Sequence, residues 1–280
     1  MADQIMKTSA ELAAIVPELW SARFYEVLTA ELPFNASVSR DYEGEISDLG
    51  DIVNISSVPE FALADELTEG ARQDADAITV TKQQLVINKR LVKDFIVTKK
   101  AQVQSLPIMD KLREHAVYSI MKKMQALVIA EIAPSALSPE HNVAFGSGTT
   151  LALSDILNAK NLLDASDVAQ GDRKMISGTS QYNDLFNITG FTSRDFIPSG
   201  SPTTQGAIVT PVLGFDAMMT TEVGNEAYLF HPSFMTMAIQ EQLDIKVYDL
   251  GVDGQRGSRV NTDLLFGLKQ LDSKRIVKIS

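Results

Sequence analysis

Apolar residues recur at helical spacing over residues 105–132, and this stretch gives the strongest helix prediction in the chain. Ser105 can serve as the N-cap, Pro107 fits the first turn, and Pro134 ends the pattern. At 1.5 Å per residue the helix would be roughly 40 Å long. One face carries apolar side chains spaced three or four residues apart, and we expect its methionines to fill a core: Met109, Leu112, Ala116, Ile120, Met124 and Leu127.

Two runs rich in β-branched residues, 49–55 and 78–87, predict a pair of strands joined by a long polar excursion at 56–77. Hairpin loops are usually two to five residues long, and connections beyond about 12–15 residues tend to be functional. An arm of this length cannot bury itself on its own strands. The pattern therefore predicts an extended hairpin that needs a partner.

Residues 9–32 predict one or two helical stretches divided at Pro17, with Leu19, Phe24, Val27, Leu28 and Leu32 at helical spacing after it. A break is expected at 33–40 and a short strand at 38–46. Trp20 is the single tryptophan. Two interpretations remain open for it: packing on its own chain and docking on a partner.

The rest of the chain mixes helices and strands, which predicts an α+β fold without an internal repeat or a clear interdomain linker. Helices are expected at 154–165, 181–186 and 232–241, and loops at 141–150 and 190–206. Strands are expected at 172–178, 207–221 around Gly214, 227–230, 243–250 and 275–279.

Charge is unevenly distributed on the predicted arm. The excursion carries Glu60, Asp65, Glu66, Glu69, Asp74 and Asp76 against Arg72 alone. The return strand is followed by Lys89, Arg90, Lys93, Lys99 and Lys100, with Asp94 among them. The acidic tip of one copy could pair with the basic base of another, or both could be solvated faces.

Composition narrows the function classes. Hydrophobic content of 45% and charged content of 22% are typical of a globular protein. No apolar run approaches the roughly 18 residues of a membrane span, and the N-terminus lacks a secretory pattern. The absence of cysteine excludes disulfides and thiolate chemistry and fits a reducing cytosol. A net charge of −11 argues against a nucleic-acid-binding domain.

No motif predicts catalysis, a metal or a cofactor. Gly146-Ser-Gly-Thr-Thr150 lacks the lysine of a phosphate-binding loop, and no G-x-S-x-G elbow occurs. His115, His141 and His231 are too far apart for a helical metal site. Asp249, Asp253 and Gly254 lack the alternating acidic ligands of a calcium loop.

Taken in order, several segments resemble the major capsid proteins of tailed bacteriophages, with the Hong Kong 97-like capsid fold. Pro17-Glu-Leu-Trp20 is similar to the opening of the family's N-terminal arm, and Gly50-Asp-Ile-Val-Asn-Ile55 to the strand before its extended hairpin, the E-loop. Residues 86–97 resemble the return strand, 105–133 the spine helix, and 154–185 the axial domain. Residues 267–279 resemble the closing strands. Ile52 and Ser56 depart from the family's usual residues.

The resemblance implies four regions. These are an N-terminal arm at 1–41, a strand and E-loop at 42–97, a peripheral domain at 98–150 completed by about 241–280, and an axial domain at 151–240. It also implies contacts between subunits, for which we name two groups and a loop at the capsomer centre. The E-loop group is Glu60, Phe61, Asp65, Glu66, Glu69, Arg72, Asp74 and Asp76, the arm and base group is Trp20, Lys89, Arg90 and Lys93, and the loop residues are Arg194 and Asp195.

The function implied is that of a shell subunit without enzymatic activity or cofactor. It would form hexamers and pentamers in an icosahedral virion assembled in the host cytoplasm. Its expected partners are copies of itself, a scaffolding protein, a portal protein and a decoration protein, with double-stranded DNA enclosed but not specifically bound and no membrane contact. A bacterial encapsulin-like nanocompartment subunit and an acid/base enzyme with a long lid loop are the alternatives.

Overall fold

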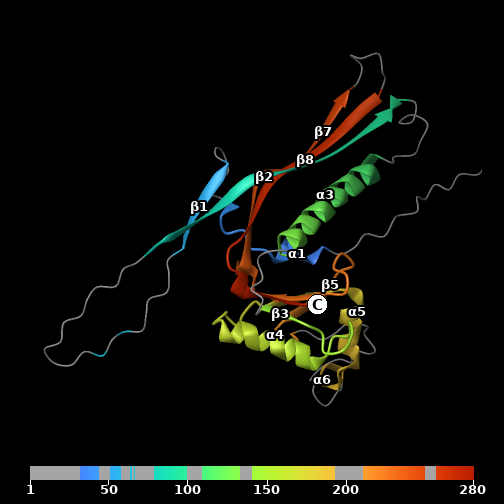
Figure 1. Ribbon diagram of the computed structural model, residues 1–280. Coiled ribbons are helices and arrows are strands. Elements are labelled where there is room, and N and C mark those ends of the chain that lie inside the picture. The colour runs from blue at the N-terminus through green and yellow to red at the C-terminus, as the bar shows by residue number, and fades with distance from the viewer. Residues whose placement is uncertain are drawn as a thin grey trace, which may run out of the picture.

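The computed structural model describes residues 32–43, 51–57, 64, 66, 79–99, 109–132, 141–192, 211–249 and 257–280. Within these ranges a long ribbon of strands rises above a smaller body of mixed sheet and helices (Figure 1). The elements are α1 (Pro33–Ser37), β1 (Ile52–Ser57), β2 (Thr81–Thr98), α3 (Met109–Ile132), β3 (Asn142–Val143), α4 (Leu153–Ala165), β4 (Lys174–Ser177), α5 (Thr179–Asp184), α6 (Thr189–Thr192), β5 (Asp216–Met219), β6 (Ala227–Phe230), β7 (Met235–Asp249), β8 (Gly257–Gln270) and β9 (Ile276–Ile279).

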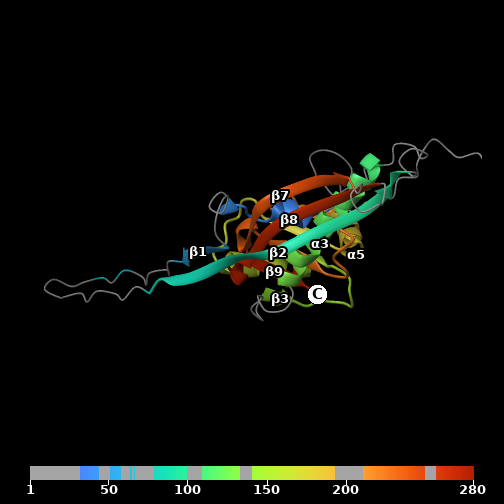
Figure 2. The ribbon, with the colours of Figure 1, turned by 90° about the horizontal axis from the view of Figure 1, so that it is seen from above.

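The ribbon is a four-stranded antiparallel sheet with strand order β1-β2-β8-β7. The predicted hairpin pairing is confirmed, with a register that runs from Ile52 opposite Val86 to Ser57 opposite Thr81. β2 continues beyond the β-branched run that ends at residue 87 to Thr98, close to the return strand at 86–97 that the resemblance implied, because β8 pairs with its second half. At about 3.3 Å per residue, its 18 residues span about 60 Å. Seen from above, β2 crosses the whole body diagonally (Figure 2).

The smaller body contains a five-stranded mixed sheet of order β3-β9-β6-β4-β5. Successive residues of its strands face opposite sides, so Met175 packs in the cluster with α4, whereas Ile176 packs in the cluster with α3. The last strand of the chain, β9, lies next to β6, and β3 lies beside it. Residues before, within and after the segment 151–240 therefore share one sheet.

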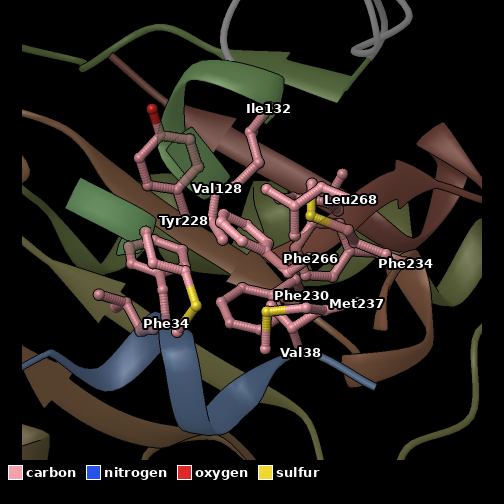
Figure 3. Packing of buried hydrophobic residues seen from close by; sticks show 14 of the residues in the cluster. Phe34, Val38, Val128, Ile132, Tyr228, Phe230, Phe234, Met237, Phe266 and Leu268 are labelled. Carbon is pink, nitrogen blue, oxygen red and sulfur yellow. The ribbon is translucent and has the colours of Figure 1, made fainter. Parts of the chain in front are cut away.

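The central core joins the ribbon, the mixed sheet and the long helix α3 (Figure 3). The predicted helix is confirmed over 109–132, and its buried apolar residues follow a step of four: Ala116, Ile120, Met124, Val128 and Ile132. Phe34 of α1 stacks on Phe230 of β6 with ring centroids 5.8 Å apart, and Phe230 meets Phe234 edge-on at 4.9 Å. This aromatic group fixes α1 against the strands.

Three local predictions are wrong. Residues 232–241 were expected to be helical, but a short 3-10 turn at Pro232–Phe234 leads directly into strand β7. Residues 33–40 begin with helix α1, whose first residue is proline, a residue favoured at that position. The described part of the predicted strand 38–46 is a turn with one isolated bridge, Ser39 to Thr236. The strand within 232–241 was missed because residues 234–238 are all buried, so the start of β7 shows no alternation of apolar and polar positions.

The remaining predicted elements are found with small shifts. The helix expected at 154–165 is α4, and the segment at 181–186 falls in α5 and the 3-10 turn after it. The strands expected at 172–178, 227–230 and 275–279 are β4, β6 and β9. Within 207–221 the strand is β5, and Gly214 lies in the turn before it with φ of 89°. Of the helical stretches predicted at 9–32, all but Leu32 lie outside the described residues.

Candidate functional site

The ribbon is the most extended part of the described structure, and β2 changes its partner along it. Residues 81–86 pair with β1, and residues 87–98 pair with β8, with an irregular register between Ile87 and Lys89. On the β1 side, no described strand pairs with β2 beyond residue 87. Such an open edge presents unpaired backbone groups and is a natural place for contact with another chain.

The basic residues predicted for the base of the arm lie on this open half of β2. Lys93 is exposed and Lys89 is half-buried, and no ion pair joins either lysine to another residue of the described ranges. Arg90 is different, because its Nε donates to Asp263 Oδ2 at 2.9 Å, across the strands of its own chain. The two lysines are therefore better placed than Arg90 to meet a partner.

A second cross-strand pair follows further along the ribbon. The Nε of Arg259 donates to Asp94 Oδ2 at 2.7 Å. The Arg259 guanidinium lowers the pKa of Asp94, and the Arg90 guanidinium lowers the pKa of Asp263. Both pairs bridge β2 and β8, so they hold these two strands together at neutral pH.

Large apolar side chains are exposed on the same face as these ion pairs. Ile96 lies opposite Arg259, which lies opposite Tyr248 on β7, so all three point to one side of the sheet. Ile96 is 56% exposed and Tyr248 is 51% exposed, and Val92 is 48% exposed on the same face. Exposed apolar residues on a sheet favour a contact surface over a purely solvated one.

The structure describes four of the predicted contact residues. Glu66 is exposed, and Lys89, Arg90 and Lys93 lie on β2 as described above. The others lie outside the described residues, and their contacts stay predictions: Trp20, Glu60, Phe61, Asp65, Glu69, Arg72, Asp74, Asp76, Arg194 and Asp195. Sequence reasoning missed Arg259, Asp263 and the exposed apolar face. The alternation Val92, Asp94, Ile96 was the signal for that face.

The titratable groups of the described core have structural partners. His141 is buried, with Nδ1 3.1 Å from the carbonyl oxygen of Ile276 and Nε2 3.3 Å from Ser166 Oγ. His231 Nδ1 lies 2.7 Å from Ser233 Oγ, and burial lowers its pKa. The described ranges contain no group of three or more acidic or histidine side chains that could hold a metal ion. None of the helices within them is long and apolar enough to cross a membrane.

These features define an α+β protein built around an extended antiparallel ribbon, a long helix along one face of it, and a compact mixed sheet below it (Figure 1). No protein-family model matches the sequence, and no curated protein matches it.

Solved structures do match the fold. A structure from Mycobacterium phage Che8 aligns with a TM-score of 0.79 at 20% identity, covering 95% of this chain and 97% of that chain. The capsid structure of cyanophage P-SCSP1u aligns with a TM-score of 0.77 at 12% identity, covering 96% of this chain and 93% of that one. The mature capsid of bacteriophage PhiM1 aligns with a TM-score of 0.73 at 10% identity, covering 95% of this chain and 91% of that chain.

The chain therefore has the fold of phage capsid proteins, and the fold predicted from the sequence, the Hong Kong 97-like capsid fold, is confirmed. The alignments extend over nearly the whole of both chains, so the ribbon, α3 and the mixed sheet all take part in the likeness.

Proposed function

We propose that the protein is the major capsid protein of a tailed bacteriophage, which assembles through hexamers and pentamers into an icosahedral shell around double-stranded DNA. The observation that carries the proposal is the full-length structural match to phage capsids, in which almost no part of either chain is left over. The nanocompartment subunit and the acid/base enzyme receive no support from these similarities. In this reading the protein is a structural component of the virion and needs no catalytic residue.

The contact that we propose between subunits uses the two ends of the β1–β2 arm. The base of the arm is anchored by a buried apolar cluster that includes Val53, Ile55, Leu85 and Ile87. Lys89 and Lys93 follow directly on the open edge of β2. The acidic residues 60–76 of a neighbouring copy supply the complementary charge, so each copy would hold the next.

Repeated contacts of this kind suit a closed shell. When one surface of each copy binds a different surface of the next, the copies form a closed ring if the rotation from copy to copy adds up to a full turn. Individually weak contacts suffice because many act together. A net charge of −11 fits a container that encloses DNA without binding it specifically. A scaffolding protein, a portal protein at one vertex and a decoration protein are the further partners we propose, with assembly in the host cytoplasm.

Electron microscopy of the purified protein, expressed alone and with a scaffolding protein encoded beside it, tests the proposal. Closed shells or rings of hexamers are the expected result. A protein that stays monomeric at all concentrations and with the scaffold would contradict it.

A charge exchange tests the arm contact separately. The pair Lys89→Glu and Lys93→Glu should reduce the yield of shells, and adding Glu66→Lys with Glu69→Lys should restore part of it. Lys123→Glu, an exposed position on α3, is the matched control for a single charge reversal. If the variant with all four changes yields as few shells as the variant with the two lysine changes alone, the lysines do not meet the acidic segment.

A further inference from the structure

An apolar groove lies between α1, the first half of α3 and strand β7, and it is unconnected with the edge of β2. Its volume is about 630 Å³. Most of its lining is apolar, with wall residues from three separated parts of the chain: Leu32, Ala36, Val117, Tyr118, Met121 and Ile245. Ile245 is 37% exposed and Ala36 is also exposed. An open apolar groove of this size calls for an occupant.

The position of Leu32 indicates which segment that is. Leu32 is the first described residue after 1–31, and it is itself part of the groove wall. The amide Nδ2 of Asn35 donates to the carbonyl of Met121 at 2.9 Å, which pins this end of the groove to α3. From there the α3 wall continues to Arg113, eight residues earlier, about 12 Å along the helix axis. The chain that precedes Leu32 is therefore attached at one end of the groove.

The sequence just before Leu32 has the pattern such a groove requires. Phe24, Val27 and Leu28 lie at helical spacing, so as a helix they would share one face. Eight helical residues, 24–31, would span about 12 Å, the same length as the α3 wall. Glu26 would lie on the opposite side of that helix, facing away from the groove. Length and pattern therefore agree.

We propose that residues 24–31 dock as a helical segment into this groove of their own chain, with Phe24, Val27 and Leu28 against Val117, Met121 and Ile245. Covalent attachment at Leu32 gives the segment a far higher effective concentration than a second copy would have. Trp20 then lies beyond the end of the groove and is left for other contacts. The docking goes beyond the proposed function and does not require a shell.

Cysteine pairs test the docking on a clean background, because the chain contains no cysteine. The double variant Leu28→Cys with Val117→Cys should form a disulfide under mild oxidation within single chains, detected by mass spectrometry of the linked peptide in a species of monomer mass. The control Glu26→Cys with Val117→Cys places the first thiol on the opposite side of the helix and should link several-fold less.

A mixing experiment distinguishes docking of a segment on its own chain from docking on a second copy. The single variants Leu28→Cys and Val117→Cys, combined before oxidation, should give no linked dimer. Linked dimers in that mixture would overturn docking within one chain in favour of exchange between copies. No link in the double variant, or equal linking in the Glu26→Cys control, would overturn the docking itself. The unassembled protein serves for all arms, so the result is independent of whether shells form.

Discussion

Gly267 occupies the point where β2 passes from one partner to the other, and it offers the sharpest test of the ribbon. It lies opposite Ile87 on β2 and opposite Ala238 on β7. A Cβ added at this glycine would be 2.6 Å from the carbonyl oxygen of Val86 and 3.1 Å from its carbon. Both atoms belong to the backbone of β2, so a small side-chain adjustment cannot relieve the contact. Gly267→Ala should therefore push β2 away from β8.

Overpacking of this kind typically costs about 1–3 kcal/mol. For a chain of this size that corresponds to a fall in melting temperature of about 2–10 °C. Thermal unfolding of the unassembled protein, followed by circular dichroism, measures the change. Gly257→Ala should behave similarly, because its Cβ would lie 2.6 Å from the carbonyl oxygen of Val97 at the other end of the β2–β8 pairing.

Gly171→Ala is the matched control, since a Cβ there meets nothing within 4 Å and the residue has no positive φ. Its expected effect is within about 0.5 kcal/mol. If Gly267→Ala unfolds at the temperature of the unchanged protein, β2 and β8 do not approach each other as described, and the account of the ribbon is wrong.

The other predictions concern the stability of the ribbon at acid pH and the contributions of two buried residues, Met124 and Arg173. The lowered pKa values of Asp94 and Asp263 give stability that is present above their unfolded pKa of about 3.8 and lost as pH falls through the folded values. The double change to asparagine should flatten the acid limb of a plot of melting temperature against pH, and an unchanged limb would refute this. Met124→Ala should cost about 2–5 kcal/mol in urea unfolding because Met124 is fully buried, with exposed Lys123→Ala as a near-neutral control. Arg173→Ala should cost about 1–3 kcal/mol, because two backbone carbonyls lose their buried donor while Asp164 keeps its ion pair with Lys160, and no measurable loss would contradict that role.

The two ion pairs of the ribbon also show how the structure changes the interpretation of charge. Arg90 is part of the basic run that the sequence predicts, but the structure pairs it with Asp263, which lies far away in the sequence. Arg259 is paired with Asp94 in the same way. A charge run along one strand therefore overstates the charge that is free for a partner, and the two lysines of the run carry the proposed contact.

Local patterns in the sequence were sufficient to predict the long helix and the pairing of the hairpin strands, and the order of segments carried the resemblance to phage capsid proteins. Helical spacing over 109–132 and β-branched runs around residue 52 and residue 85 are local patterns, so they survive in almost any tertiary context. The order of these segments along the chain was enough to predict the fold that the structural matches confirm.

The strand conformation of β7 depends on tertiary contacts that no local pattern in the sequence shows. Residues 232–241 lack the alternation of a strand because the beginning of β7 is buried on both faces, and its conformation is set by pairing with β8, more than twenty residues later. The same strand β8 extends β2 to Thr98. Backbone hydrogen bonds between distant segments favour these conformations over local propensity, and no single stretch of sequence contains that information.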